Sequence, residues 1–215
     1  LRHSPTKMIF SSSKKFIFFA VPKTGTHAVR EAIRPSLGKD DWEQQALTGV
    51  MLSPVPQLAK IGHGHISYQQ LAEVLTNEHI GSYFSFAVVR HPIDRFMSVC
   101  AFLARTDPSY NDNPVAWSQS AFQRARFRER ILVRPQVEML TDDTGEIAIS
   151  FIGRYETLQE DLNHILQRLD VPAAELARRN VTHNQKPKLR TDPGFIRDLN
   201  DFYADDFRLL GYSQN

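Results

Sequence analysis

Two runs of mostly apolar residues, at 16–21 and 83–89, stand out along the chain. Runs of this length are typical of strands that are buried on both faces of a parallel sheet. Each run ends in a polar turn, and each turn leads into a segment with the pattern of a helix. Strands that alternate with helices indicate βαβ units, so the pattern predicts an α/β fold in which helices flank a small central parallel sheet.

The rest of the chain follows the same alternation, with few strands and many helices. We predict strands at 16–21, 83–89 and around 147–152, and helices at 25–35, 40–50, 67–76, 92–105, 114–131, 156–169, 173–179 and 193–207. Loops are predicted at 53–65, 106–113 and 180–192. The chain shows no internal repeat, so we expect a single domain at 16–215 after an N-terminal extension at 1–15.

The composition narrows the class of protein without identifying it. A length of 215 residues, of which 41% are hydrophobic and 23% charged, suits one well-buried α/β domain. The net charge of +2 argues against a protein that coats nucleic acid. Cys100 is the only cysteine, which excludes an internal disulfide and fits a reducing compartment. We find no apolar run near the ~18 residues of a membrane span and no signal peptide in residues 1–15, so we expect a cytoplasmic protein.

The first apolar run ends in the turn Pro22-Lys23-Thr24-Gly25-Thr26-His27. A turn between a strand and a helix start is an anion site, because the first amide N–H groups of a helix have no partner within it and the helix dipole favours negative charge. Lys23 adds a cation, and the two threonines add hydroxyl donors. The turn is neither a Walker loop, because its lysine precedes its only glycine, nor a Rossmann fingerprint, which needs three spaced glycines. It therefore predicts a site for a phosphate or sulfate group.

The second apolar run ends in Arg90-His91-Pro92-Ile93-Asp94-Arg95, and Ser98 follows about two turns into the next predicted helix. Pro92 and Asp94 fit the start of a helix. An arginine fork and a hydroxyl suit a second phosphate, although Arg90 suits an ion pair with Asp94 as well. Two anion sites that follow two strands of one sheet imply a ligand with two separated charged groups.

The pair of motifs resembles that of the sulfotransferases over residues 16 to the C-terminus. Their 5′-phosphosulfate loop reads close to residues 22–26, and their 3′-phosphate motif reads close to residues 90–95 and Ser98. The resemblance implies 3′-phosphoadenosine-5′-phosphosulfate (PAPS) as sulfuryl donor, PAP as product and no metal ion. His27 departs from the pattern, since many members carry Ser or Thr there. The donor contacts implied are Pro22, Lys23, Thr24, Gly25, Thr26, His27, Arg90 and Ser98.

Gly62-His63-Gly64-His65 lies in a predicted loop between the two motifs. Histidine accepts a proton near neutral pH, and residues i and i+2 of an extended segment face the same side, so both rings can reach one pocket. The element resembles the hexuronic-acid 2-O-sulfotransferase branch, which implies a general base here, with His65 as the base and His63 as its helper. A zinc pair and a surface loop are the alternatives, although two histidines lack the four ligands of a structural zinc site.

Other polar segments are compatible with both a functional and a structural role. Arg134-Pro135-Gln136 resembles a recurrent family element near the acceptor, and Arg154 lies where the family shapes the acceptor side. The resemblance places the loop at 180–192 over PAPS, with Lys186, Lys188 and Arg190 as candidate phosphate contacts. Solvated helix faces are the expectation for the basic stretch at 124–134 and for the pair Asp205-Asp206.

These observations together predict sulfuryl transfer from PAPS to an acceptor hydroxyl on a carbohydrate or glycolipid, in a bacterial cytoplasm. His65 or His63 would take the hydroxyl proton, and Lys23 would stabilise the charge on departing PAP. Sulfation of tyrosine or a small molecule is a competing hypothesis. A P-loop kinase or NTPase is a second one, although the chain lacks its Walker lysine and acidic magnesium ligand, and a binding protein without activity is a third. The sequence does not indicate the oligomeric state.

Overall fold

A computed structural model describes residues 6–45, 55–61, 63–176 and 192–214. The chain divides into two compact units. The first, which we call the sheet unit, comprises Leu1–Val89 and Glu138–Ala177. The second, the helical unit, comprises Arg90–Val137 and Arg178–Asn215. Each unit is therefore built from two separate segments of the chain.

The described strands form one five-stranded sheet in the order β3-β1-β2-β4-β5. Strand β2 runs parallel to β4, and β4 runs parallel to β5, whereas β1 is antiparallel to both β2 and β3. The predicted α/β class with a central sheet and flanking helices is confirmed, with β2, β4 and β5 as its parallel part. The bounds are β1 Thr6–Ser11, β2 Phe16–Phe19, β3 Trp42–Gln45, β4 Phe84–Val89 and β5 Phe151–Arg154.

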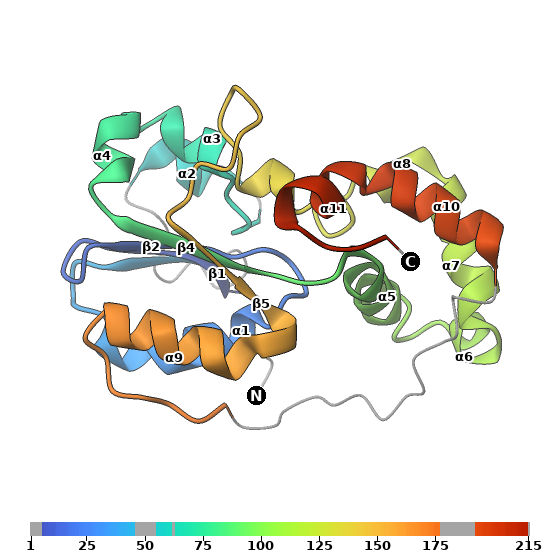
Figure 1. Ribbon diagram of the computed structural model, residues 1–215, viewed down its shortest axis with the longest axis horizontal. Coiled ribbons are helices and arrows are strands. Elements are labelled where there is room, and N and C mark those ends of the chain that lie inside the picture. Colours follow the sequence, from blue (N-terminus) through green and yellow to red (C-terminus); the bar gives the residue numbers. More distant parts are fainter. Residues whose placement is uncertain (1–5, 46–54, 62, 177–191, 215) are drawn as a thin grey trace. The chain divides into compact units, whose positions relative to one another are not determined.

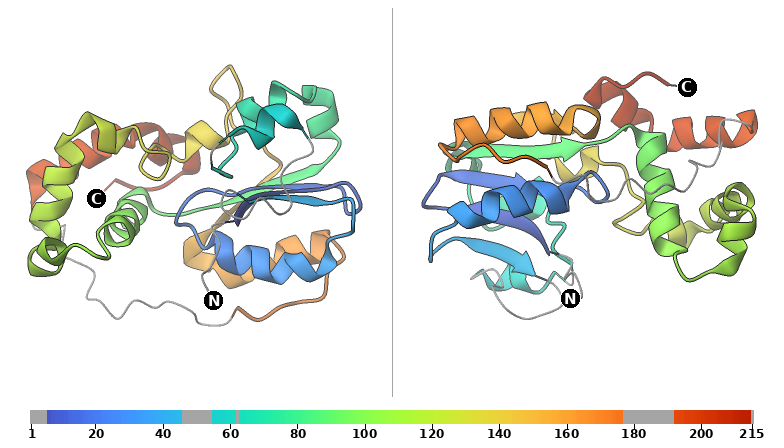
Figure 2. Two further views of the ribbon diagram at one scale, coloured as in Figure 1. Left: turned by 180° about the vertical axis from the view of Figure 1, so that it is seen from behind. Right: turned by 90° about the horizontal axis from the view of Figure 1, so that it is seen from below.

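Helices cover both faces of the sheet, which explains why nearly all residues of β2 and β4 are apolar. Helices α1 (Thr26–Ile33) and α9 (Leu158–Arg168) lie on one face, and α2 (Pro56–Ala59), α3 (Tyr68–Ala72) and α4 (Asn77–Gly81) lie on the other (Figures 1 and 2). Alternate residues of a strand point to opposite faces. The core against α1 and α9 contains Phe16, Phe18, Phe86, Val88, Val29, Ile33, Leu162 and Ile165.

The helix predicted at 40–50 is wrong for residues 42–45, which form β3; residues 46–50 lie outside the described part. Long-range pairing outweighs the local helical pattern here. Trp42 stacks on Phe10 of β1 with ring centroids 5.4 Å apart, and Glu43 forms an ion pair with Arg30 of α1. No strand is predicted before residue 16, yet β1 lies between β2 and β3 in the sheet.

Several predicted helices are present but are shorter or divided. The predicted segment 114–131 forms α7 (Pro114–Gln123) and α8 (Ala125–Arg128), and 193–207 forms α10 (Pro193–Phe202) and α11 (Ala204–Leu210). Short helices α2 and α6 (Pro108–Asp112) lie in predicted loops. The helix predicted at 173–179 is not formed over residues 173–176; its remaining residues lie outside the described part. Turns with the 3-10 geometry are η1 (Arg34–Ser36), η2 (Val137–Met139) and η3 (Tyr155–Thr157).

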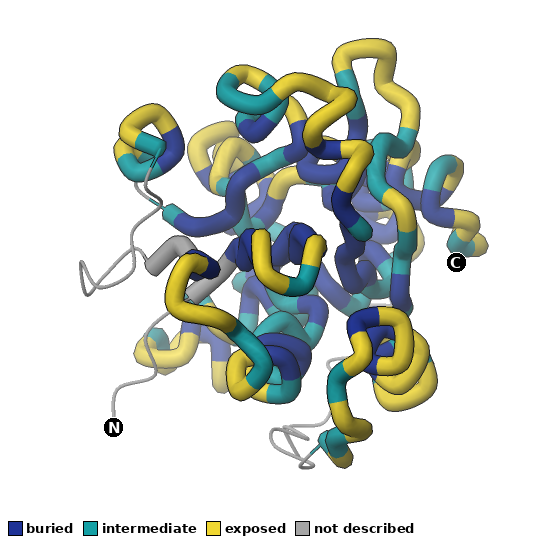
Figure 3. Tube along the Cα trace, turned by 90° about the vertical axis from the view of Figure 1, so that its left-hand side faces the viewer, coloured by how far each residue is buried: buried dark blue, intermediate teal, exposed yellow. Residues whose placement is uncertain are grey.

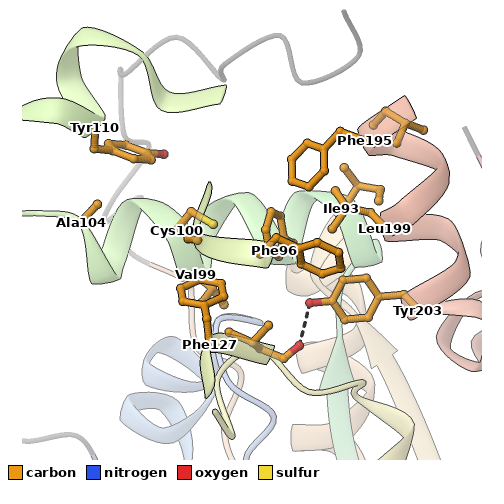
Figure 4. Close-up of a cluster of buried hydrophobic side chains, with 14 of the residues drawn as sticks. Ile93, Phe96, Val99, Cys100, Ala104, Tyr110, Phe127, Phe195, Leu199 and Tyr203 are labelled. Atoms are coloured by element: carbon orange, nitrogen blue, oxygen red, sulfur yellow. Dashed lines mark hydrogen bonds between the residues drawn. The ribbon is translucent and has the colours of Figure 1, made fainter. Parts of the chain in front are cut away.

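The core of the helical unit is built around Phe96 of α5 (Pro92–Leu103), and Figure 4 shows it. The Phe96 ring packs against the rings of Phe122 and Phe195, with centroids 5.7 and 5.9 Å away. Cys100 is buried in the same cluster, and burial raises the pKa of its thiol to about 12, so the thiol stays protonated at neutral pH. In both units buried residues line the inner faces of the elements, and exposed residues lie on the outer turns (Figure 3).

Candidate functional site

The turn between β2 and α1 contains two residues in the left-handed region of backbone conformation. Gly25 has φ 83° and Lys23 has φ 66°. A residue with a side chain adopts this conformation at a cost of about 1–2 kcal/mol, and such strain is often found at functional sites. The hydroxyl of buried Thr24 donates to the carbonyl of Val21 at 2.9 Å, which closes the turn. The side chain of Thr24 therefore supports the loop from within.

The N-terminal end of α1 lies directly after this turn. The amides of Ala28 and Val29 donate to the carbonyl of Gly25 at 2.9 and 3.3 Å, so the helical hydrogen bonds begin at Gly25. By helix geometry the amides that precede them point out of the end of the helix, where an anion is stabilised. Pro22 is buried, and Lys23 and Thr26 are half-buried. The predicted arrangement of strand, turn and helix is therefore formed, and the binding of an anion there stays a prediction.

The space around Gly25 also leaves no room for a side chain. A Cβ atom on it would lie 2.8 Å from Cδ2 of Leu158 and 3.2 Å from Cδ2 of Tyr155. Gly145 has the same φ of 83°, but a Cβ there would meet nothing within 4 Å. The two glycines therefore share a backbone conformation and differ in crowding.

We expect Gly25→Ala to lower the free energy of unfolding by more than Gly145→Ala does. In both variants the alanine must adopt the left-handed backbone conformation, which costs about 1–2 kcal/mol. Only Gly25→Ala also forces Leu158 and Tyr155 to move. Urea unfolding of the two variants beside the unchanged protein measures the difference. Equal losses would contradict the crowding at Gly25.

His27 lies where the family pattern has a hydroxyl residue, and its ring contacts Arg30 and Glu31 of the same helix, α1. Nη2 of Arg30 lies 3.2 Å from Nδ1 of His27 and donates to it, because a guanidinium has no acceptor. In the neutral ring the proton then lies on Nε2, which is 3.2 Å from a carboxylate oxygen of Glu31. Arg30 also pairs with buried Glu43 at 2.8 Å, as does Arg34 at the same distance. This ion-pair group ties α1 to β3.

His65 lies at the end of β2, beside the turn that carries Lys23. Its side chain is buried, with 7% of the residue exposed, and Nδ1 is 2.6 Å from the carbonyl oxygen of Ala20. A carbonyl only accepts, so Nδ1 carries the proton and the neutral ring has its lone pair on Nε2. The amide of Met8 donates to the carbonyl of Gly64 at 2.9 Å and holds the segment against β1. The structure therefore brings His65 to the same strand end as the turn that carries Lys23.

His63 lies near His65 but is held differently. The two ring centroids are 6.2 Å apart, and His63 is half-buried where His65 is buried. Among the described residues, no group of three or more His, Cys, Asp or Glu could hold a metal ion. The hydrogen bond to Ala20 and the burial of the ring fix the orientation of His65.

In the helical unit, Arg90 follows β4 directly and is half-buried. Its amide donates to Oε1 of Gln136 at 2.9 Å, and its carbonyl accepts from Nε2 of Gln136 at 2.8 Å. Pro92 starts α5 as predicted, and Ser98 lies half-buried on that helix. Gln136, predicted as an acceptor contact, uses its side-chain amide to bind the backbone of Arg90.

Asp206 is a polar residue of this region that the sequence pattern placed wrongly at the surface. It is fully buried, and its carboxylate accepts from Nε2 of Gln136 at 3.1 Å and from the amide of Val137 at 3.0 Å. Burial raises the pKa of Asp206, and the charge of Arg95 opposes this shift. The side chain of Asp205 is 63% exposed and pairs with Arg208. Adjacent helical residues lie about 100° apart, so the pair is divided between core and solvent.

The remaining candidates are less closely tied to the site. Arg134 is exposed, and half-buried Arg154 ends β5 with its amide bound to Asp161 at 2.8 Å. Lys186, Lys188 and Arg190 lie outside the described residues. Arg124, Arg126 and Arg130 of the basic stretch are exposed, as predicted, and they border a cavity of about 440 Å³ in the helical unit. This cavity is lined by Leu103, Asp107, Trp117, Arg124, Arg126, Phe127 and Arg130.

Comparison with protein-family models matches residues 6–213 to the sulfotransferase family. Searches of curated proteins and of solved structures gave no match. Within the part of the chain that is described, no helix is both long enough and apolar enough to cross a membrane. The family match covers both units, including His65, Arg90 and the turn that carries Lys23.

Proposed function

Because the chain belongs to the sulfotransferase family, we propose that it transfers a sulfuryl group from PAPS to a hydroxyl of a carbohydrate or glycolipid acceptor. The family supports sulfuryl transfer in general, and the donor, the acceptor class and a cytoplasmic location are our proposal. The observation that supports it best is the hydrogen bond between His65 and Ala20, which orients a histidine ring at the strand end that carries Lys23. A proton acceptor and a cation are the two groups that this reaction needs from the protein.

The residues of the turn suit the phosphosulfate end of PAPS. The left-handed backbone at Gly25 needs a residue without Cβ, and the start of α1 and the charge of Lys23 both favour an anion. When bound, PAPS supplies the sulfuryl group and leaves as PAP. We assign the backbone amides of residues 24–27 to the 5′-phosphate and the Lys23 ammonium to the negative charge that develops on the departing oxygen.

His65 is the proposed general base. Its Nδ1–H bond to Ala20 fixes the tautomer and the ring orientation, so that Nε2 takes the proton of the acceptor hydroxyl. After protonation the Nδ1–H group still donates to the carbonyl oxygen, which stabilises the imidazolium. We assign His63, whose ring lies 6.2 Å away, to orienting the acceptor.

Arg90 and Ser98 are the proposed contacts of the 3′-phosphate. A guanidinium binds phosphate through two parallel N–H bonds, and a serine hydroxyl adds a third donor. Lys186 and Lys188 complete the proposed donor contacts. Arg134 and Arg154 remain the proposed acceptor contacts, whereas the side-chain amide of Gln136 is engaged by the backbone of Arg90.

We test the donor by thermal unfolding with PAP and with ATP and magnesium. We expect PAP to raise the melting temperature and ATP with magnesium to leave it unchanged, because the 3′-phosphate contributes to binding only in PAP. Equal shifts would favour a P-loop kinase or NTPase and contradict the proposal.

Radiolabelled PAPS with an acceptor panel then tests the reaction. The panel contains a uronic-acid polysaccharide, a neutral glycan, a glycolipid, a tyrosine peptide and a phenol. We expect label on a glycan or the glycolipid. Label on the peptide or the phenol alone would contradict the acceptor class while leaving PAPS as the donor.

A further inference from the structure

The side chain of Gln136 binds the backbone of Arg90 in the way that a neighbouring strand would. One amide group satisfies both the N–H and the C=O of Arg90, at 2.9 and 2.8 Å. A carboxamide carries a donor and an acceptor side by side, whereas an ionised glutamate only accepts and leucine does neither. Gln136 is 1% exposed, and a buried polar side chain must be hydrogen-bonded to be tolerated.

Asp206 fixes the orientation of that amide. Its Oδ2 accepts from Nε2 of Gln136, which identifies the nitrogen end of the side chain, and its Oδ1 accepts from the amide of Val137. The carboxylate therefore binds both the side chain of Gln136 and the backbone that follows it. No other rotation of the Gln136 amide satisfies Arg90 and Asp206 together.

The segment that carries Gln136 is held from α5 as well. Arg95 is fully buried, and its guanidinium donates to the carbonyls of Leu132, Val133 and Arg134 at 2.9, 3.2 and 2.6 Å. The hydroxyl of Tyr203 donates to the carbonyl of Val133 at 2.6 Å (Figure 4). Buried networks of this kind hold one geometry, because every broken bond leaves a buried polar group unsatisfied.

We infer that Gln136 and Asp206 are positioning residues for recognition of the 3′-phosphate. They fix the backbone of Arg90 so that its guanidinium presents its two N–H donors in one direction, and neither residue touches the nucleotide. This inference rests on the role of Arg90 in the proposed function. The ligand chemistry concerned is a ribose 3′-phosphate.

The test compares the affinities for PAP and for adenosine 5′-phosphate (AMP), which differ only in the 3′-phosphate. The quantity measured by calorimetry is the ratio of the two dissociation constants. We expect Gln136→Leu to reduce the preference for PAP roughly tenfold and to leave the affinity for AMP unchanged, as coupled neighbours do. In an Arg90→Ala background the same change has no further effect on the ratio. A purely structural role would weaken both ligands equally.

Gln119 provides the matched control, because its side-chain amide also donates to an aspartate in the helical unit, Asp192. Gln119→Leu should leave the PAP preference unchanged. If Gln136→Leu does not fold, Asp206→Asn is the second variant, since it keeps the shape and loses one of the two bonds. We expect it to reduce the PAP preference about threefold.

The outcomes separate the inference from the proposed function. If Arg90→Ala keeps the preference for PAP, the assignment of the 3′-phosphate to Arg90 is wrong. If Arg90→Ala removes the preference while Gln136→Leu and Asp206→Asn leave it intact, the positioning role is wrong and the role of Arg90 stands.

Discussion

Replacing His65 by glutamine is expected to lower the rate constant for sulfuryl transfer by about 10²- to 10⁴-fold, the usual contribution of a well-placed general base. Glutamine can still donate an N–H to the carbonyl of Ala20, so the buried hydrogen bond has a substitute. It offers no group that takes up a proton at neutral pH. The affinity for PAP should stay the same, because His65 acts on the acceptor hydroxyl.

His63→Gln is the matched control for this experiment. The His63 ring is close to that of His65 but is less buried, and we assign it an orienting role. We expect its effect to appear mainly in KM for the acceptor, with a smaller change in kcat. Single-turnover rates and PAP calorimetry on both variants distinguish the two roles. A larger loss of kcat in His63→Gln than in His65→Gln would show that His63, and not His65, is the general base.

Lys23→Gly is the second change with a large expected effect, and it should lower the activity without lowering the stability. Lys23 has φ 66°, a conformation that glycine adopts without strain. The relief of about 1–2 kcal/mol exceeds or matches the entropy that glycine adds to the unfolded chain, so the free energy of unfolding should stay level or rise by up to about 1 kcal/mol. Loss of the ammonium should lower kcat by roughly 10²- to 10³-fold.

Lys15 offers a control of the same residue type and conformation. It has φ 54° and lies exposed in the turn between β1 and β2. Lys15→Gly should change the stability in the same direction and leave kcat unchanged. Denaturant unfolding and steady-state rates on both variants give the comparison. A fall in stability in Lys23→Gly alone, with kcat retained, would contradict the proposed role of the cation.

The sequence pattern was sufficient for the parts of the fold that are covered on both sides. Strands β2 and β4 are packed between two helical layers, so nearly every residue in them is apolar and the runs are easy to recognise. The turn at Lys23 and Gly25 follows from the same local pattern, because a strand end, a glycine and a helix start are adjacent in the chain. The role of each of these residues in binding stays a prediction.

Strands β1 and β3 could not be predicted from local patterns. Strand β3 has a polar sequence and is defined by its pairing with β1 and by the ion pair between Glu43 and Arg30. Strand β1 lies between polar segments, and its apolar run of Met8, Ile9 and Phe10 is too short to stand out in the sequence. In both strands the contacts that decide the structure come from distant residues, which a window along the sequence does not contain.

The contact between Gln136 and Asp206 was also not predictable, because the two residues are 70 positions apart. A partial signal exists in α11. Asp206 shares a helix face with Tyr203, Phe207 and Leu210, which are all buried. A carboxylate in the middle of an apolar stripe is a candidate for a buried hydrogen-bonded role.

The divided helical unit has a consequence for synthesis on the ribosome. The aromatic cluster around Phe96 needs Phe195, Leu199, Tyr203 and Phe207 from α10 and α11, the last described helices to be translated. Until those helices emerge, α5 and α7 have apolar faces without their native cover, and such surfaces attract chaperones or other nascent chains. Slow translation of the segment between Ala177 and Asp192 would prolong this exposed state, so yield in expression should depend on codon choice there.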